Sequence, residues 1–204
     1  MKSYSLVASL LISVLLVSSC GQISKSSLPA VDEGEMPKTV TNYLTEQYKD
    51  FPGTKLSILP AEKFTYDVAV GGWTSESKGS WIIASLLQGK PLLAAGMYKA
   101  RLSDPTRPDA IEGTLLGEWD ISLNARPSRL FKVQTSLGGD DHLQYVLFTG
   151  DTTAAYRIIG SVEEDELILA PRVRKSLLSI FYDPERQVGQ GTQTSASPCN
   201  CPKQ

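Results

Sequence analysis

The stretch that decides the fold is Thr114–Leu123, with the sequence TLLGEWDISL. Its second, fourth, sixth, eighth and tenth residues are Leu115, Gly117, Trp119, Ile121 and Leu123. The residues between them are mostly polar or charged, and they include Glu118 and Asp120. Because successive side chains of a β-strand point to opposite faces, this alternation predicts a strand with one apolar face and one polar face.

Seven further segments show a strand-like pattern, so about eight strands are expected in succession. These segments are residues 64–70, 80–87, 91–102, 131–135, 143–147, 156–162 and 167–173. Short links rich in Gly, Pro, Asp and Asn separate them, and a parallel pair of strands would need a crossover of a dozen or more residues. We therefore predict a mainly β domain, in which an antiparallel sheet closes into a barrel or folds into a sandwich.

The two ends of this domain carry helical spacing. Val40, Leu44 and Tyr48 recur every fourth residue, which predicts a short N-terminal helix within residues 37–48. Near the other end, residues 174–182 fit either a short helix or one more strand. The predicted organisation is a signal peptide (1–19), a flexible tether (20–36), a β-rich domain (37–186) and a disordered tail (187–204).

The overall charge excludes one class of function. The chain has 204 residues, which suits one domain with appendages, and a formal net charge of -2. A nucleic-acid-binding role therefore has no electrostatic support. The short acidic run at residues 163–166 is interpreted as a solvated turn.

The N-terminal segment has the order of a secretion signal. An apolar run at residues 6–17 is too short to span a bilayer as a helix, and Val17-Ser18-Ser19-Cys20 follows at its end. This order resembles the lipobox of bacterial lipoprotein precursors. The resemblance implies cleavage before Cys20 and acylation of its thiol, so that the membrane holds the chain through a lipid anchor. Gly21, in place of Asp, implies the outer membrane if the host is Gram-negative.

A second, smaller resemblance concerns the segment Gly117-Glu118-Trp119. A Gly-x-Trp on a strand is similar to the lipocalins, in which the tryptophan closes one end of a small barrel. That resemblance implies a carrier of a small apolar ligand with Trp119 as a ligand-binding residue. The alternative is that Trp119 belongs to an ordinary sheet core.

Few residues have the arrangement that catalysis needs. His142 is the only histidine, and its neighbour Asp141 would point to the opposite face of a strand, so neither a Ser-His-Asp site nor a zinc site is supported. Glu118 and Asp120 share a strand face about 7 Å apart, which suits a glycosidase pair or simply a solvated face. No metal or cofactor is expected.

The two remaining cysteines lie close together in the C-terminal tail. Cys199 and Cys201 are expected to form a local or intermolecular disulfide in an oxidising compartment.

These observations favour a lipid-anchored protein of the cell envelope with a non-enzymatic binding, structural or assembly role. Its expected partners are the membrane and another envelope protein or a polysaccharide. A lipocalin-like carrier and an envelope hydrolase are the two alternatives.

Overall fold

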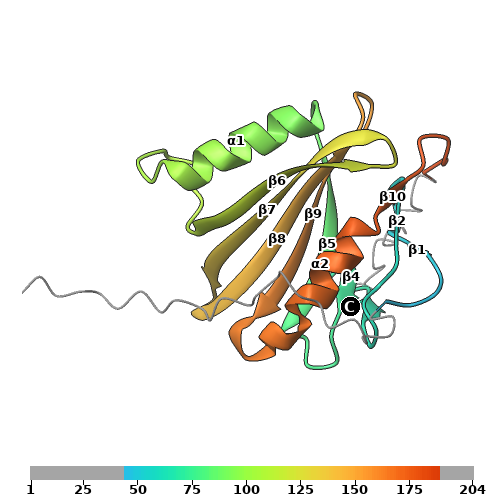
Figure 1. The fold of residues 1–204 in the computed structure, drawn as a ribbon, viewed down its shortest axis with the longest axis horizontal. Coiled ribbons are helices and arrows are strands. Elements are labelled where there is room, and N and C mark those ends of the chain that lie inside the picture. The colour runs from blue at the N-terminus through green and yellow to red at the C-terminus, as the bar shows by residue number, and fades with distance from the viewer. Residues whose placement is uncertain (1–43, 189–204) are drawn as a thin grey trace, which may run out of the picture. The chain divides into compact units, whose positions relative to one another are not determined.

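The larger of two sheets contains seven strands, and all of its neighbouring strands are antiparallel (Figure 1). The computed structural model describes residues 44–188. The strands, in their order across the sheet, are β3 (Thr65–Asp67), β4 (Gly72–Thr74), β5 (Ser80–Leu87), β9 (Ala155–Glu163), β8 (Asp140–Gly150), β7 (Arg126–Leu137) and β6 (Thr114–Leu123).

A smaller sheet joins segments from both ends of the described chain. Its three antiparallel strands are β1 (Lys49–Asp50), β2 (Leu56–Ile58) and β10 (Phe181–Tyr182), with β2 in the middle. The seven-stranded sheet does not close into a barrel. The mainly β prediction is therefore confirmed, and of its two forms the structure has the sandwich-like one.

Helix α1 (Pro91–Ser103) occupies the segment for which a strand was predicted, so that prediction was wrong. Ala95, Tyr98 and Leu102 turn toward the core at helical spacing, whereas the apparent alternation around Tyr98 had suggested a strand. Most of the helix is Leu, Ala, Met, Lys or Arg, which favour helices, and Pro91 stands in its first turn.

The same helix explains a second error, the expectation that no crossover helix was present. The alternating antiparallel pairs make β5 and β6 run in the same direction, although three strands separate them. A connection between strands that run the same way must cross the sheet, and α1 supplies that crossover.

The C-terminal segment was predicted partly correctly. The expected strand at 167–173 is wrong, because a 3-10 helix, η1 (Glu164–Leu169), leads directly into α2 (Ala170–Leu178). Val173 and Leu177, four residues apart, are fully buried, which is the spacing of one helix face. The expected helix at 174–182 is present in part, since α2 ends at Leu178 and β10 follows.

The predicted N-terminal helix is wrong for its described part, residues 44–48. Leu44 instead forms a β-bridge with Ala61, and the backbone N–H of Thr45 donates to the carbonyl of Pro60 at 2.9 Å. These long-range backbone bonds hold the segment against the loop after β2, so tertiary pairing overrides the local helical spacing. Residues 37–43 lie outside the described part of the chain.

Helix α1 covers one face of the large sheet through an aromatic cluster. The ring of Tyr98 lies 5.6 Å from that of Phe131 and 5.4 Å from that of Phe148. Val133 and Val146 complete the buried cluster around these rings. Burial of such side chains contributes about 1.5–3 kcal/mol each, so this face anchors the helix.

Helix α2 covers the opposite face of the same strands. Val146 of β8 pairs with Ile159 of β9 on the face that α1 covers. The next pair, Tyr145 with Gly160, therefore points to the opposite face. A Cβ atom on Gly160 would lie 2.4 Å from Val173 and 2.7 Å from Leu177, so the missing side chain lets the helix approach the sheet closely. Strand β8 is consequently buried on both faces from residue 142 to residue 150.

A hydrogen-bonded tyrosine connects the small sheet to the large one. The hydroxyl of Tyr182 in β10 donates to Asp151, just after β8, at 2.8 Å. Burial raises the pKa of Asp151, but hydrogen bonds from Thr153, Ala154 and Tyr182 outweigh it and hold that pKa below its usual range. Burial and the same bond raise the pKa of Tyr182 to about 12.

The close contact at Gly160 yields a test with an internal control. Gly160→Ala is expected to lower the free energy of unfolding by about 1–3 kcal/mol, because the new methyl group overlaps Val173 and Leu177. Gly96, in α1, has open space where a Cβ would lie. Gly96→Ala is therefore expected to raise the free energy of unfolding by about 0.5–1 kcal/mol, because alanine favours a helix more than glycine does. Urea unfolding of both variants measures the two values. Equal effects would contradict the packing described here.

Candidate functional site

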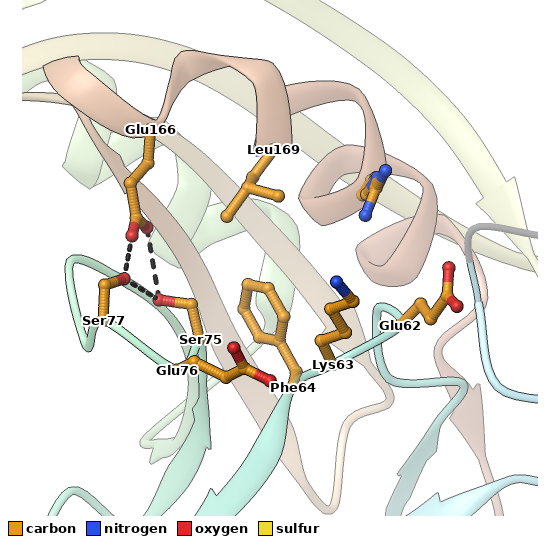
Figure 2. Close-up of a pocket in the computed structure, with 9 residues that line it drawn as sticks. Glu62, Lys63, Phe64, Ser75, Glu76, Ser77, Glu166 and Leu169 are labelled. Atoms are coloured by element: carbon orange, nitrogen blue, oxygen red, sulfur yellow. Dashed lines mark hydrogen bonds between the residues drawn. The ribbon is translucent and has the colours of Figure 1, made fainter.

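A pocket of about 310 Å³ lies where three separate segments of the described chain meet (Figure 2). One wall is the segment that leads into β3, the second is the turn between β4 and β5, and the third is η1 with the first turn of α2. In the same order, these walls contribute Glu62, Lys63 and Phe64, then Ser75, Glu76 and Ser77, then Glu166, Leu169 and Arg172.

The carboxylate of Glu166 is the centre of a hydrogen-bonded wall of the pocket. The hydroxyl of Ser75 donates to it at 3.2 Å, and the hydroxyls of Ser77 and Ser80 donate to it as well. Ser80 has no exposed surface, so its hydroxyl depends on this acceptor. Two hydroxyls from the turn and one from the first residue of β5 thus bind one carboxylate from η1, as Figure 2 shows for Ser75 and Ser77.

Two further contacts shape the turn, one within it and one with the end of β9. The backbone N–H of Ser80 donates to the Ser75 hydroxyl at 3.2 Å. A Cβ on Gly79 would lie 2.3 Å from a carboxylate oxygen of Glu163, so a larger residue would require the end of that side chain to move. The interpretation of 163–166 as a solvated turn is therefore wrong for Glu166, which is half-buried among the serines.

The other side of the pocket combines an apolar surface with charges of both signs. Phe64 is buried, and its ring rises between Glu76 and Lys63 in Figure 2. Glu62, Lys63 and Glu76 are exposed around it. The pocket can therefore receive an apolar group at its floor and charged groups of either sign at its rim.

Ser176 of α2 and Ser179, the residue that follows the helix, hold this wall in place. The hydroxyl of Ser176 donates to the carbonyl of Leu59 at 2.6 Å, and the N–H of Leu59 donates to the hydroxyl of Ser179 at 2.9 Å. Both backbone groups of Leu59 are thereby bound to the helix. The chain then runs to Ala61, which pairs with Leu44, and into the pocket residues 62–64.

The single histidine lies outside this pocket. His142 is 8% exposed, and its Nδ1 lies 3.1 Å from the hydroxyl of Ser161. That serine has no exposed surface, and Asp141 points to the other face of β8. The structure brings a serine to the histidine, which the sequence did not indicate, but in this conformation the pair is closed to a substrate.

Trp119 packs against its own strand and against α2. Its ring covers Gly117, where a Cβ would lie 2.5 Å from the indole, and the guanidinium of Arg174 lies 5.6 Å from the ring centre. Strand β6 is an edge strand of an open sheet, so Trp119 does not close one end of a barrel, as the similarity to lipocalins implied. The Gly-x-Trp pattern is explained by this stacking of the ring on a glycine.

The paired carboxylates of β6 are engaged by cations. Lys99 of α1 lies 2.5 Å from Glu118, and Arg129 of β7 lies 2.7 Å from Asp120 and 3.4 Å from Glu118. Together these contacts form a small ion-pair network at the sheet edge. The solvated-face interpretation holds for Asp120, which is exposed, whereas Glu118 is half-buried between Lys99 and Arg129.

The remaining predicted sites are not covered by the structure. Cys20, Cys199 and Cys201 lie outside the described residues. Within residues 44–188, no three His, Cys, Asp or Glu side chains are placed to hold a metal ion, and no helix is long and apolar enough to cross a membrane.

No protein-family model and no curated protein matches the chain. Among solved structures, the cyanobacterial PsbP (CyanoP) of Synechocystis sp. PCC 6803 has a TM-score of 0.48 at 9% identity, covering 74% of this chain and 98% of that one. A protein of unknown function from Pseudomonas aeruginosa has a TM-score of 0.43 at 14% identity, covering 74% and 90%.

A third similar structure is a longer protein from Bacteroides thetaiotaomicron VPI-5482. Its TM-score is 0.41 at 12% identity, covering 66% of this chain and 47% of that one, so the chain matches about half of that protein's length. At these identities and TM-scores, none of the three similarities carries a conclusion about function.

The Glu166 cluster makes a prediction that separates it from an ordinary acidic turn. Glu166→Ala is expected to lower the free energy of unfolding by about 1–3 kcal/mol, because the buried Ser80 hydroxyl loses its acceptor. Glu164→Ala, at an exposed neighbouring position, is expected to change it by less than about 0.5 kcal/mol. Urea unfolding gives both values, and hydrogen exchange should accelerate at residues 75–80 only in the Glu166 variant. Similar behaviour of the two variants would show that the cluster does not hold the turn.

Proposed function

We propose that the chain is a lipid-anchored protein of the cell envelope with a non-enzymatic binding role, and that the pocket beside Phe64 binds a segment of a partner polypeptide. The anchor is the acylated Cys20 that the lipobox-like order of residues 17–20 implies. In a Gram-negative host the anchoring membrane would be the outer membrane.

The observation that carries the binding role is the composition of the pocket. A buried aromatic floor surrounded by exposed Glu62, Lys63 and Glu76 fits a polypeptide segment with one apolar side chain and neighbouring charges. A sugar chain is usually held by an exposed aromatic face, whereas Phe64 is only 6% exposed. A polypeptide partner therefore fits this pocket better than a polysaccharide.

The connection to the anchor keeps this pocket within reach of the membrane. The described chain begins at Leu44, which pairs with Ala61 next to the pocket residue Glu62. Fully extended, the 24 residue steps from Cys20 to Leu44 span at most roughly 80 Å. A partner that lies in or near the same membrane is thus accessible to the pocket.

Lipid attachment has a direct test in the native host. The chain is expected to incorporate a labelled fatty acid, and Cys20→Ser is expected to abolish the label and release the chain from the membrane fraction. Cys199→Ser serves as the matched control and should retain the label. Label that persists in the Cys20 variant would contradict the anchor.

The binding role is tested by crosslinking in intact cells. A photo-crosslinking residue at Glu76, on the pocket rim, is expected to capture a discrete polypeptide, whereas the same residue at Val68, which is 85% exposed outside the pocket, should not. Adding Lys63→Glu should reduce capture at Glu76 by about tenfold, since it reverses a rim charge. Equal capture at both positions, or capture unaffected by Lys63→Glu, would refute the pocket as the binding site.

A further inference from the structure

The outer face of helix α1 is apolar, although it contributes nothing to the core. Leu93 is 64% exposed and Met97 is 59% exposed, one turn apart, and Leu92 is 37% exposed beside them. Gly96 and Ala100 continue this face without adding a polar side chain. We call Leu92, Leu93, Gly96, Met97 and Ala100 the outer face of α1.

This face has no cover within the described chain. The inner side of the helix already packs on the sheet through Ala95 and Tyr98, which are buried. In Figure 1, α1 lies across the edge of the fold with no other described element on its far side. An exposed cluster of adjacent Leu and Met on one helix face marks an interaction surface, whereas single exposed apolar residues do not.

The charged side chains of the helix are all basic, and two of the three are paired with carboxylates of neighbouring segments. Every charged residue from position 90 to position 103 is a cation: Lys90, Lys99 and Arg101. Lys99 is bound to Glu118 at 2.5 Å and Arg101 to Asp109 at 3.3 Å. Helix α1 carries no carboxylate of its own, so it brings to a membrane no side-chain charge that anionic headgroups would repel.

We propose that the outer face of α1 rests on the lipid bilayer, in the headgroup region of the membrane to which the chain is anchored. This inference rests on the proposed lipid anchor at Cys20. The anchor and the segment that joins it to Leu44 confine the domain to the bilayer surface. A second membrane contact is then intramolecular, so even the three large side chains of the outer face suffice for it.

Methionine oxidation reports on this contact directly. The chain has three methionines, Met1, Met36 and Met97, and Met97 stands on the outer face while Met36 provides an internal reference in the tether. The full acylated chain is reconstituted in vesicles of phosphatidylethanolamine and phosphatidylglycerol and treated with hydrogen peroxide. Mass spectrometry then gives the oxidation rate of Met97 relative to Met36, because accessible thioethers oxidise fastest.

In the parent chain, Met97 is expected to oxidise at least about fivefold more slowly than in a Leu93→Glu variant, whose new charge opposes insertion of the helix. Ile168→Glu, at a position 83% exposed on η1, is the matched control and should leave Met97 protected. Because both replaced side chains are exposed, both variants should fold, and thermal unfolding verifies that they do.

The outcomes separate the inference from the function on which it rests. A chain without the acyl mass on Cys20 would overturn the anchor, and the inference with it. An acylated chain in which Met97 oxidises equally fast in the parent and the Leu93→Glu variant would overturn the inference alone. Protection in native membranes but not in protein-free vesicles would also overturn it, since a protein would then cover the face. Protection that appears only with rising protein density would identify a second copy of the chain as the cover and refute the lipid contact.

Discussion

The burial of strands β8 and β9 on both faces is the constraint on which the rest of the structure depends. On one face, Tyr98 of α1 packs against Phe131 and Phe148. On the other, α2 approaches closely because Gly160 has no side chain. A sheet buried on both sides needs a covering layer on each, so α1 and α2 are as necessary to the fold as the strands themselves.

The candidate site follows from the second of these contacts. Since α2 is fixed against Gly160, Ser176 and Ser179 lie where they bind both backbone groups of Leu59. The same placement puts η1 above the β4–β5 turn, where Glu166 receives the serine hydroxyls. The pocket therefore exists because the helix that covers the core is preceded by η1, which meets the β4–β5 turn and supplies one wall.

The sequence predicted the strands whose apolar and polar residues alternate, but it did not predict the covering helices or the pocket. The strand at Thr114–Leu123 is present at an edge of the sheet. Its predicted single apolar face is wrong at one end, because a β-bulge between Leu115 and Gly117 turns Leu115 toward the cluster under α1 and away from the face of Trp119. From residue 145 to residue 148, β8 is apolar at every position instead of alternating, so Val146 and Phe148 are apolar on the same side as Gln144. Such a continuous apolar run is typical of a strand buried on both faces, and it could have predicted a covering helix. The pocket was not predictable, because its three walls are far apart in the sequence and Glu166 resembles its solvated neighbours until the fold brings Ser80 to it.

The outer face of α1 is the feature that the fold does not require. Packing determines Ala95 and Tyr98, which point inward, and the crossover between β5 and β6 determines only that a helix is present. Helix propensity does not explain the outer side chains either, because Lys, Glu and Gln favour helices about as well as Leu and Met. Exposed Leu93 and Met97 also increase the tendency of the domain to aggregate, because they can associate with other apolar surfaces. Because polar residues would serve the fold equally well, the contact outside the domain that we propose gives these side chains a role. Under the lipid anchor proposed at Cys20, the nearest surface that such a contact can meet is the membrane itself.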